Sequence, residues 1–137
     1  MSTPVTIIMI EDDEGHARLI ERNIRRSGVN NEITSITNGT EAVNYLFGAD
    51  GNGLPHKGES LLILLDLNLP DMTGIEILRR VKENRYLKYA PVVVLTTTDD
   101  SQEITRCYEL GCSVDIANAI RQLGLFFSII QVPQATP

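Results

Sequence analysis

The stretch Leu61-Leu62-Ile63-Leu64-Leu65-Asp66 (residues 61–66) contains five large apolar residues in succession and ends in a carboxylate. Such an uninterrupted apolar run is typical of a strand that is buried on both faces, as in the centre of a parallel sheet. Asp66 would then lie at the carboxyl end of that strand, where sheets of this type bind their ligands. The run therefore predicts a central strand with a functional side chain at its end.

Segments with strand and helix patterns alternate four times along the chain. This order implies right-handed crossovers between parallel strands, so the expected fold class is α/β with a doubly wound parallel sheet. The glycine-rich segment 48–60 is expected to be a surface loop with His56 in solvent. The strands are expected at 5–10, 32–37, 61–65 and 92–96, and the helices at 15–27, 41–47, 74–84 and 100–110, with Asn38-Gly39-Thr40 as a turn and helix cap.

The composition limits the class of protein. A length of 137 residues suits one domain, 1–137, with a real hydrophobic core. The net charge of −6 argues against nucleic acid as a partner, because a phosphate backbone needs a basic surface. No stretch approaches the roughly 20 apolar residues of a membrane span, and the first residues lack the basic region of a signal peptide. We expect a cytoplasmic protein without a membrane contact.

Polar side chains stand at the ends of three of the expected strands. Glu11 and Asp12 follow the first strand, Asp66 follows the third, and Thr96 is the last residue of the fourth. A single aspartate after an apolar strand is more often a loop cap or a solvated end, but three acids and a threonine in this order are not. Gathered carboxylates repel one another, which a divalent cation with oxygen ligands relieves, and Mg²⁺ is the usual choice. Asp66 is the natural nucleophile for phosphoryl transfer, and Thr96 can donate a hydrogen bond to the phosphoryl group. His16 is expected on the helix surface.

The chain resembles the receiver domains of two-component response regulators. The similar stretches are IIMIEDDEGHARLIE, LLILLDLNLPDMTGIEILRRVK, APVVVLTTTDD and ELGC, and they cover roughly residues 4–113. The loop at 48–60 and the ending AIRQLGLFFSIIQVP resemble in particular the stand-alone receivers that serve bacterial phytochrome kinases. The resemblance implies a flavodoxin-like receiver fold and a sensor histidine kinase as the partner.

The resemblance also implies roles for individual residues. Asp66 matches the phosphorylated aspartate, and Thr96 matches the switch hydroxyl. Glu11 and Asp12 match the acidic pair that binds Mg²⁺, with Glu11 where many members have aspartate. Asn68 matches the position whose main-chain carbonyl completes the metal coordination. The implied metal ligands are therefore Glu11, Asp12, Asp66 and the carbonyl of Asn68.

The similarity breaks after Val114. The family continues with a fifth strand, a switch aromatic residue and a lysine, whereas this chain continues directly into the last helix and has no lysine after Lys88. We therefore expect a sheet truncated to four strands (1–112), followed by a C-terminal helix and tail (113–137). The two last helices are expected to form one arm over about 100–129. The apolar face of this arm would pack on a second copy, which gives a homodimer by arm exchange.

The leading functional interpretation is a single-domain response regulator that is not an enzyme. It would accept a phosphoryl group on Asp66 from a sensor histidine kinase, act through protein–protein contacts, and have no small-molecule substrate besides phosphoryl donors. Without the family lysine, phosphorylation is expected to be slow or uncoupled. The alternative is a phosphorylation-independent pseudo-receiver that serves as a binding and dimerisation module. A phosphatase with an aspartyl nucleophile is disfavoured, because Asn68 stands where that chemistry commonly uses a second acid.

Overall fold

The computed structural model describes residues 5–26, 28–95 and 109. Within these residues four parallel strands form one sheet in the order β2-β1-β3-β4. The strands are β1 (Thr6–Ile10), β2 (Ile33–Ile36), β3 (Leu61–Leu65) and β4 (Val92–Val94), and the helices are α1 (Glu14–Arg26), α2 (Gly39–Phe47) and α3 (Gly74–Glu83), with a short 3-10 helix η1 (Leu54–His56). The elements begin and end within about three residues of the sequence expectations.

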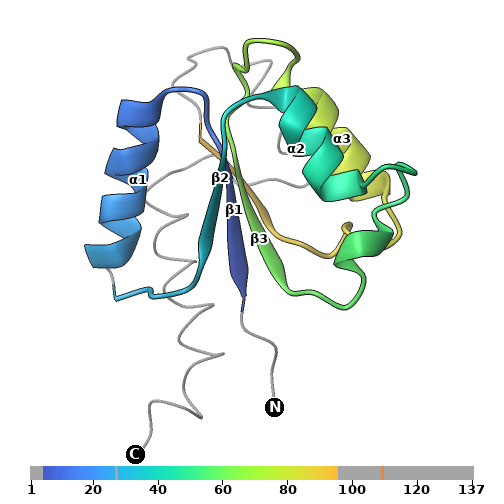
Figure 1. Ribbon diagram of the computed structural model, residues 1–137, viewed down its shortest axis with the longest axis horizontal. Helices are drawn as coiled ribbons and strands as arrows, with labels where there is room; N and C mark the ends of the chain where they lie inside the picture. Colours follow the sequence, from blue (N-terminus) through green and yellow to red (C-terminus); the bar gives the residue numbers. More distant parts are fainter. Residues whose placement is uncertain (1–4, 27, 96–108, 110–137) are drawn as a thin grey trace, which may run out of the picture.

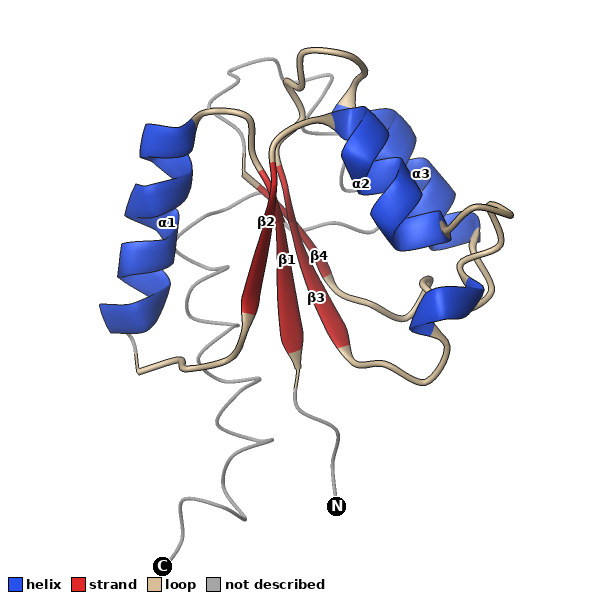
Figure 2. Cartoon of the chain, in the orientation of Figure 1, coloured by secondary structure: helices blue, strands red, loops and turns tan. Residues whose placement is uncertain are grey.

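Helices cover the two faces of the sheet in the arrangement that the alternating order predicts. Helix α1 lies on one face, and α2 and α3 lie side by side on the other (Figures 1 and 2). All four strands run in the same direction, and β1 and β3 are the inner strands. The expected α/β class with a doubly wound parallel sheet is therefore confirmed.

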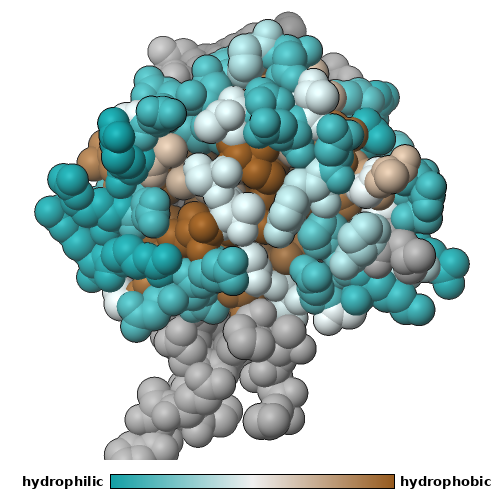
Figure 3. Space-filling view, viewed as in Figure 1, coloured by the Kyte–Doolittle hydropathy of each residue, from teal (hydrophilic) through white to brown (hydrophobic). Residues whose placement is uncertain are grey.

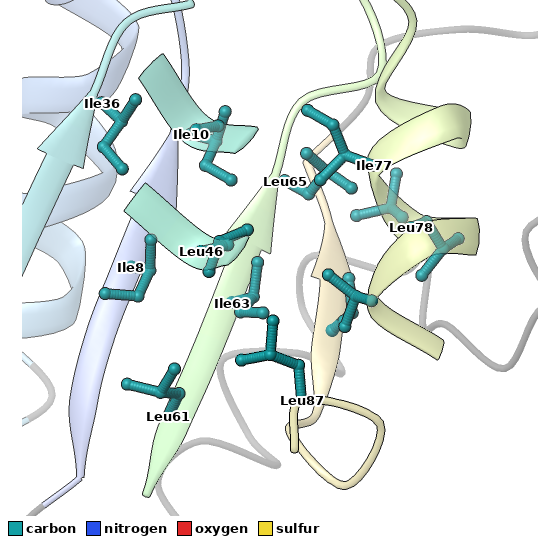
Figure 4. Packing of buried hydrophobic residues seen from close by; sticks show 14 of the residues in the cluster. Ile8, Ile10, Ile36, Leu46, Leu61, Ile63, Leu65, Ile77, Leu78 and Leu87 are labelled. Atoms are coloured by element: carbon teal, nitrogen blue, oxygen red, sulfur yellow. The ribbon is translucent and has the colours of Figure 1, made fainter. Parts of the chain in front are cut away.

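The apolar strands divide their side chains between two cores. Because neighbouring side chains of a strand point to opposite faces, Ile63 and Leu65 face α2 and α3, whereas Leu62 and Leu64 face α1. Figure 4 shows the first core, where Leu46, Ile77 and Leu78 pack on the strands. All five residues of β3 are buried, so the prediction of a strand covered on both faces is confirmed.

Local polar contacts fix where the first two helices begin. The side chain of Asn38 accepts a hydrogen bond of 2.8 Å from the amide of Glu41, which caps α2 as the sequence predicted. Asp13 does the same for α1, since its Oδ1 accepts a 3.0 Å bond from the amide of His16. Because β1 and β2 pair in parallel, with Ile10 opposite Ile36, the acidic turn after β1 and the turn after β2 lie at the same edge of the sheet.

The loop between α2 and β3 differs from the sequence expectation at His56. This side chain was expected in solvent, but it is only 6% exposed. Its Nε2 lies 2.5 Å from the carbonyl oxygen of Tyr45, its Nδ1 lies 3.1 Å from Oε2 of Glu59, and its ring packs 5.0 Å from that of Tyr45. The prediction was wrong because the loop folds back on α2, where these partners satisfy both ring nitrogens.

Several expectations concern residues outside those described. These are the helix at 100–110, the arm over about 100–129, the arm-exchanged homodimer and the position of Thr96.

No helix among the described residues is both long enough and apolar enough to cross a membrane. The face shown in Figure 3 is mostly hydrophilic over its helices, with smaller hydrophobic areas between them.

Candidate phosphoryl-transfer site

Strand register brings the predicted site residues together. Ile10 and Leu65, the last residues of β1 and β3, are direct partners in the parallel ladder. The amide of Asp66 donates a 2.9 Å hydrogen bond to the carbonyl of Ile10, and the amide of Glu11 donates a 3.0 Å bond to the carbonyl of Ile36. Glu11 and Asp66 therefore follow neighbouring strands at the same level, although 55 residues separate them in the sequence.

The carboxylates of Glu11, Asp12 and Asp66 form a compact cluster. Each offers an oxygen atom, and these atoms all lie within 4.8 Å of one another. Glu11 and Asp66 are 2% and 8% exposed, whereas Asp12 is open to solvent. The cluster borders an open cavity of about 500 Å³, whose walls also include Asp13, His16, Asn68 and Leu95. Three of the five predicted site residues, Glu11, Asp12 and Asp66, thus meet at one cavity. A fourth, Asn68, lies in the wall of this cavity.

The charged form of Glu11 is unfavourable in this cluster. Burial, followed by the adjacent Asp66 carboxyl and then the charges of Asp12 and Asp13, raises the pKa of Glu11 from 4.5 to about 8. Its Oε2 atom is buried and has no hydrogen-bond partner among the described residues. An unpartnered buried oxygen and three converging carboxylates fit a hard divalent cation with oxygen ligands. The site residues are therefore suited to hold such an ion.

The loop after β3 is held close to Asp66. The amide of Asn68 donates a 3.0 Å hydrogen bond to Oδ1 of Asp66, Asn68 forms an antiparallel bridge with Thr73, and the amide of Gly74 donates a 2.9 Å bond to the carbonyl of Leu67. A Cβ atom on Gly74 would lie 2.4 Å from the Asp66 carbonyl oxygen, so only glycine allows this approach. These bonds and the close approach at Gly74 bring the start and the end of the loop together beside Asp66.

Asp71 connects the same loop to α2. Its carboxylate accepts hydrogen bonds of 2.7 Å from the amides of both Gly39 and Thr40, and a further bond from the Thr40 hydroxyl. The Thr40 hydroxyl, followed by the Gly39 amide, lowers the pKa of Asp71. Met72 packs so close to Gly39 that a Cβ there would lie 2.2 Å from its Cγ. Sequence reasoning missed this tether, because the bonded residues are more than 30 positions apart.

His16 was predicted to lie on the helix surface, and its side chain on α1 is 31% exposed. The prediction did not include its contact with the site: the side chain borders the cavity and contacts Oε1 of Glu11 through Nδ1. The start of α1 directly after the acidic turn explains this position, because the first turn of the helix faces the carboxyl end of β1. Its spacing of five residues from Glu11 was the only sequence signal. Thr96 lies outside the described residues.

Known proteins are similar to this chain in sequence and in fold. The family described as response regulator receiver domain matches residues 7–121. The response regulator Rcp1 of Synechocystis is 32% identical over 93% of this chain and 85% of its own length. A receiver domain from Rhodospirillum rubrum is 62% identical, with a TM-score of 0.81 over 90% of this chain and 94% of that one.

Two further similar proteins were solved in a phosphorylated form and in a metal-bound form. The phosphorylated cyanobacterial phytochrome response regulator RcpA is 32% identical, with a TM-score of 0.69 over 95% of this chain and 92% of that one. The Mn²⁺-bound form of Rcp1 is 29% identical, with a TM-score of 0.67 over 91% and 93%. The parallel sheet, the acidic cavity and the match over residues 7–121 together show that the chain belongs to the response regulator receiver domain family, whose members are signalling modules.

Proposed function

We propose that this protein is a phosphorylation-dependent receiver that accepts a phosphoryl group on Asp66 from a sensor histidine kinase. The observation that carries the proposal is the position of Asp66 at the end of β3, in the wall of an open cavity and beside the carboxylates of Glu11 and Asp12. A carboxylate oxygen of Asp66 would attack phosphorus while the bond to the donor histidine nitrogen breaks. The product is an acyl phosphate on Asp66.

The proposal includes Mg²⁺ as the cofactor, held by Glu11, Asp12, Asp66 and the main-chain carbonyl of Asn68. When bound, the ion supplies positive charge that offsets the carboxylates and the transferring phosphoryl group. The Asn68 amide holds Oδ1 of Asp66, which fixes the orientation of the nucleophile. The role of Thr96 as a hydroxyl donor to the phosphoryl group rests on the family resemblance.

The relatives support a proposal about the type of kinase. Rcp1 and RcpA resemble this chain over more than nine-tenths of its length, and RcpA is a phytochrome response regulator. We infer that the donor is a histidine kinase of the phytochrome type and that the protein acts with it in the cytoplasm. The open cavity suits this partner, because a phosphohistidine on another protein must reach Asp66.

A second candidate is favoured by one sequence feature. The chain has no lysine after Lys88. It therefore lacks the lysine side chain that the family places opposite the phosphoryl group. This absence favours a pseudo-receiver that binds its partners without phosphorylation and dimerises by exchange of its C-terminal arm. The two functions differ in whether Asp66 is modified.

Intact-mass measurement after incubation with acetyl phosphate and Mg²⁺, or with an autophosphorylated phytochrome kinase, separates the two functions. We expect slow addition of one phosphoryl group to the wild type and to Asp50→Asn, an exposed loop variant, and none to Asp66→Asn. If neither donor modifies the wild type, phosphorylation is excluded and the pseudo-receiver stands. If Asp66→Asn is modified as readily as the wild type, the assignment of the acceptor is wrong.

A further inference from the structure

A second cavity lies at the opposite edge of the sheet. It measures about 210 Å³ and opens at the amino ends of β3 and β4, between the loop that carries η1 and the loop from α3 to β4. These two loops lie near each other at the lower right of Figure 2. Its floor is apolar, formed by residues such as Leu61 and Leu87, and its walls include Tyr86 and Tyr89.

Cationic side chains lie over both tyrosine rings. Lys57 Nζ is 6.0 Å and the Arg85 guanidinium carbon 5.5 Å from the centre of the Tyr86 ring, and Lys88 Nζ is 5.1 Å from that of the Tyr89 ring. These distances are within the range of cation–π attraction. Lys57, Arg85 and Lys88 are all exposed, and Tyr89 is 80% exposed. Cations and aromatic rings thus form a single exposed surface around the cavity.

Lysine is rare in this chain but is concentrated at this surface. The chain has only three lysines, and its net charge is −6. The third lysine, Lys82, donates a 3.3 Å hydrogen bond to the carbonyl of Ala90, another residue of the cavity wall. All three lysines therefore contact the walls of one small cavity. Among the described residues that line its walls, only Glu59 is acidic, and its carboxylate lies beside the ring of His56.

We propose that this cation–tyrosine surface, formed by Lys57, Lys82, Arg85, Tyr86, Lys88 and Tyr89, docks an acidic segment of a partner protein. The cations complement carboxylates of that segment, and one apolar or aromatic side chain of the segment fills the cavity. Tyrosine and arginine are the residues that dominate protein–protein contacts. The cavity is smaller than the roughly 300–1,000 Å³ of small-molecule sites, so it takes a side chain rather than a cofactor.

Nucleic acid is the less suitable occupant. A phosphate backbone requires a continuous basic stripe, whereas this surface is a local patch on a strongly acidic chain. The surface also lies away from the acidic site, because the five residues of β3 separate the two edges by about 16 Å. A partner docked here leaves the cavity at Asp66 open to a kinase. The inference therefore goes beyond the proposed function and does not depend on phosphorylation.

Fluorescence anisotropy with the full chain tests the proposal. The probe is a labelled random copolymer of glutamate and tyrosine, compared with polyglutamate, a lysine–tyrosine copolymer and single-stranded DNA. We expect the glutamate–tyrosine copolymer to bind most tightly, with affinity that falls as salt is added. The double variant Lys57→Glu/Lys88→Glu should lose at least about tenfold in affinity. The matched variant Arg18→Glu/Arg22→Glu, with the same charge change on exposed positions of α1, should lose less than about twofold.

A second measurement does not depend on charge-reversed variants. Bound copolymer should slow the acylation of Lys57 and Lys88, measured by peptide mass, whereas the lysine–tyrosine copolymer should not. Three results would overturn the proposal: no binding of the glutamate–tyrosine copolymer, an equal loss of affinity in both double variants, or tighter binding of single-stranded DNA. The second would show unspecific attraction to the whole surface, and the third would identify a nucleic-acid site.

Discussion

Replacement of Glu11 by glutamine is expected to remove a pH dependence of stability that the metal-free protein has. The pKa of Glu11 is about 8 in the folded chain, against an ordinary value of 4.5. The folded state therefore holds a proton that the unfolded chain releases. This contribution to stability is complete below pH 4.5 and is lost as the pH rises through about 8.

An upper limit on the effect follows from the same two values. Between them, the free energy of unfolding falls by at most about 1.4 kcal/mol for each pH unit. The total loss is smaller than the two values alone would give, because the cavity beside Glu11 is open to water, which screens the charges. Asp66, Asp12 and Asp13 face Glu11 with like charge, and His16 contacts it from α1. Because the wild type and Glu11→Gln share these neighbours, the difference between the two proteins reports the contribution of Glu11.

Urea denaturation in a metal chelator at several pH values between 5 and 8.5 measures this difference. Wild type should lose stability with rising pH relative to Glu11→Gln, whereas Glu14→Gln, an exposed substitution on α1, should follow the wild type. Saturating Mg²⁺ should reverse the slope for wild type, because the ion binds the deprotonated carboxylates. Parallel pH profiles for the wild type and Glu11→Gln would refute the reasoning.

Three further substitutions test the scaffold of the site. Asp71→Ala should lower the free energy of unfolding, because the amides of Gly39 and Thr40 lose their acceptor, and should weaken Mg²⁺ binding in calorimetry; Asp50→Ala, in an exposed loop, should change neither, and equal effects would contradict the tether. Gly74→Ala should cost about 1–3 kcal/mol because its Cβ meets the Asp66 carbonyl, whereas Gly15→Ala in α1 should change stability by less than about 1 kcal/mol; an unchanged Tm for Gly74→Ala would disprove the close approach. Ile63→Ala should cost about 2–5 kcal/mol in urea titration, and a much smaller loss would show a loosely packed β3.

The sheet and the carboxylate cluster could be predicted because local signals determine them. The apolar run of Leu61–Leu65 specifies a strand buried on both faces, and parallel pairing places the residues after each strand at one edge. Once the strand ends were assigned, Glu11 and Asp66 had to meet. The sequence also marked the α2 cap at Asn38, because its bond to Glu41 spans only three residues.

The parts that could not be predicted depend on the course of loops. His56 is buried only because the segment before β3 folds back on Tyr45, and no periodicity in a glycine-rich loop reports such a path. Asp71 resembles any polar loop residue until α2 is placed against it. In both cases a polar side chain satisfies main-chain groups that are distant in the sequence, which requires the tertiary structure.

The contacts around the acidic cavity explain why a site made of like charges can exist before a cation arrives. The carboxylates of Glu11 and Asp66 repel each other, and the hydrogen bonds of Asp71 to the positively polarised N-terminus of α2 oppose an outward movement of the loop that follows Asp66. The same loop is closed at its base by Gly74. The repulsion is therefore relieved by protonation of Glu11 or by a bound cation rather than by movement of the ligands. A loop tethered at its tip and an unfavourable charge cluster would together favour a divalent ion, so substitutions at Asp71 and Glu11 should change metal affinity through different causes.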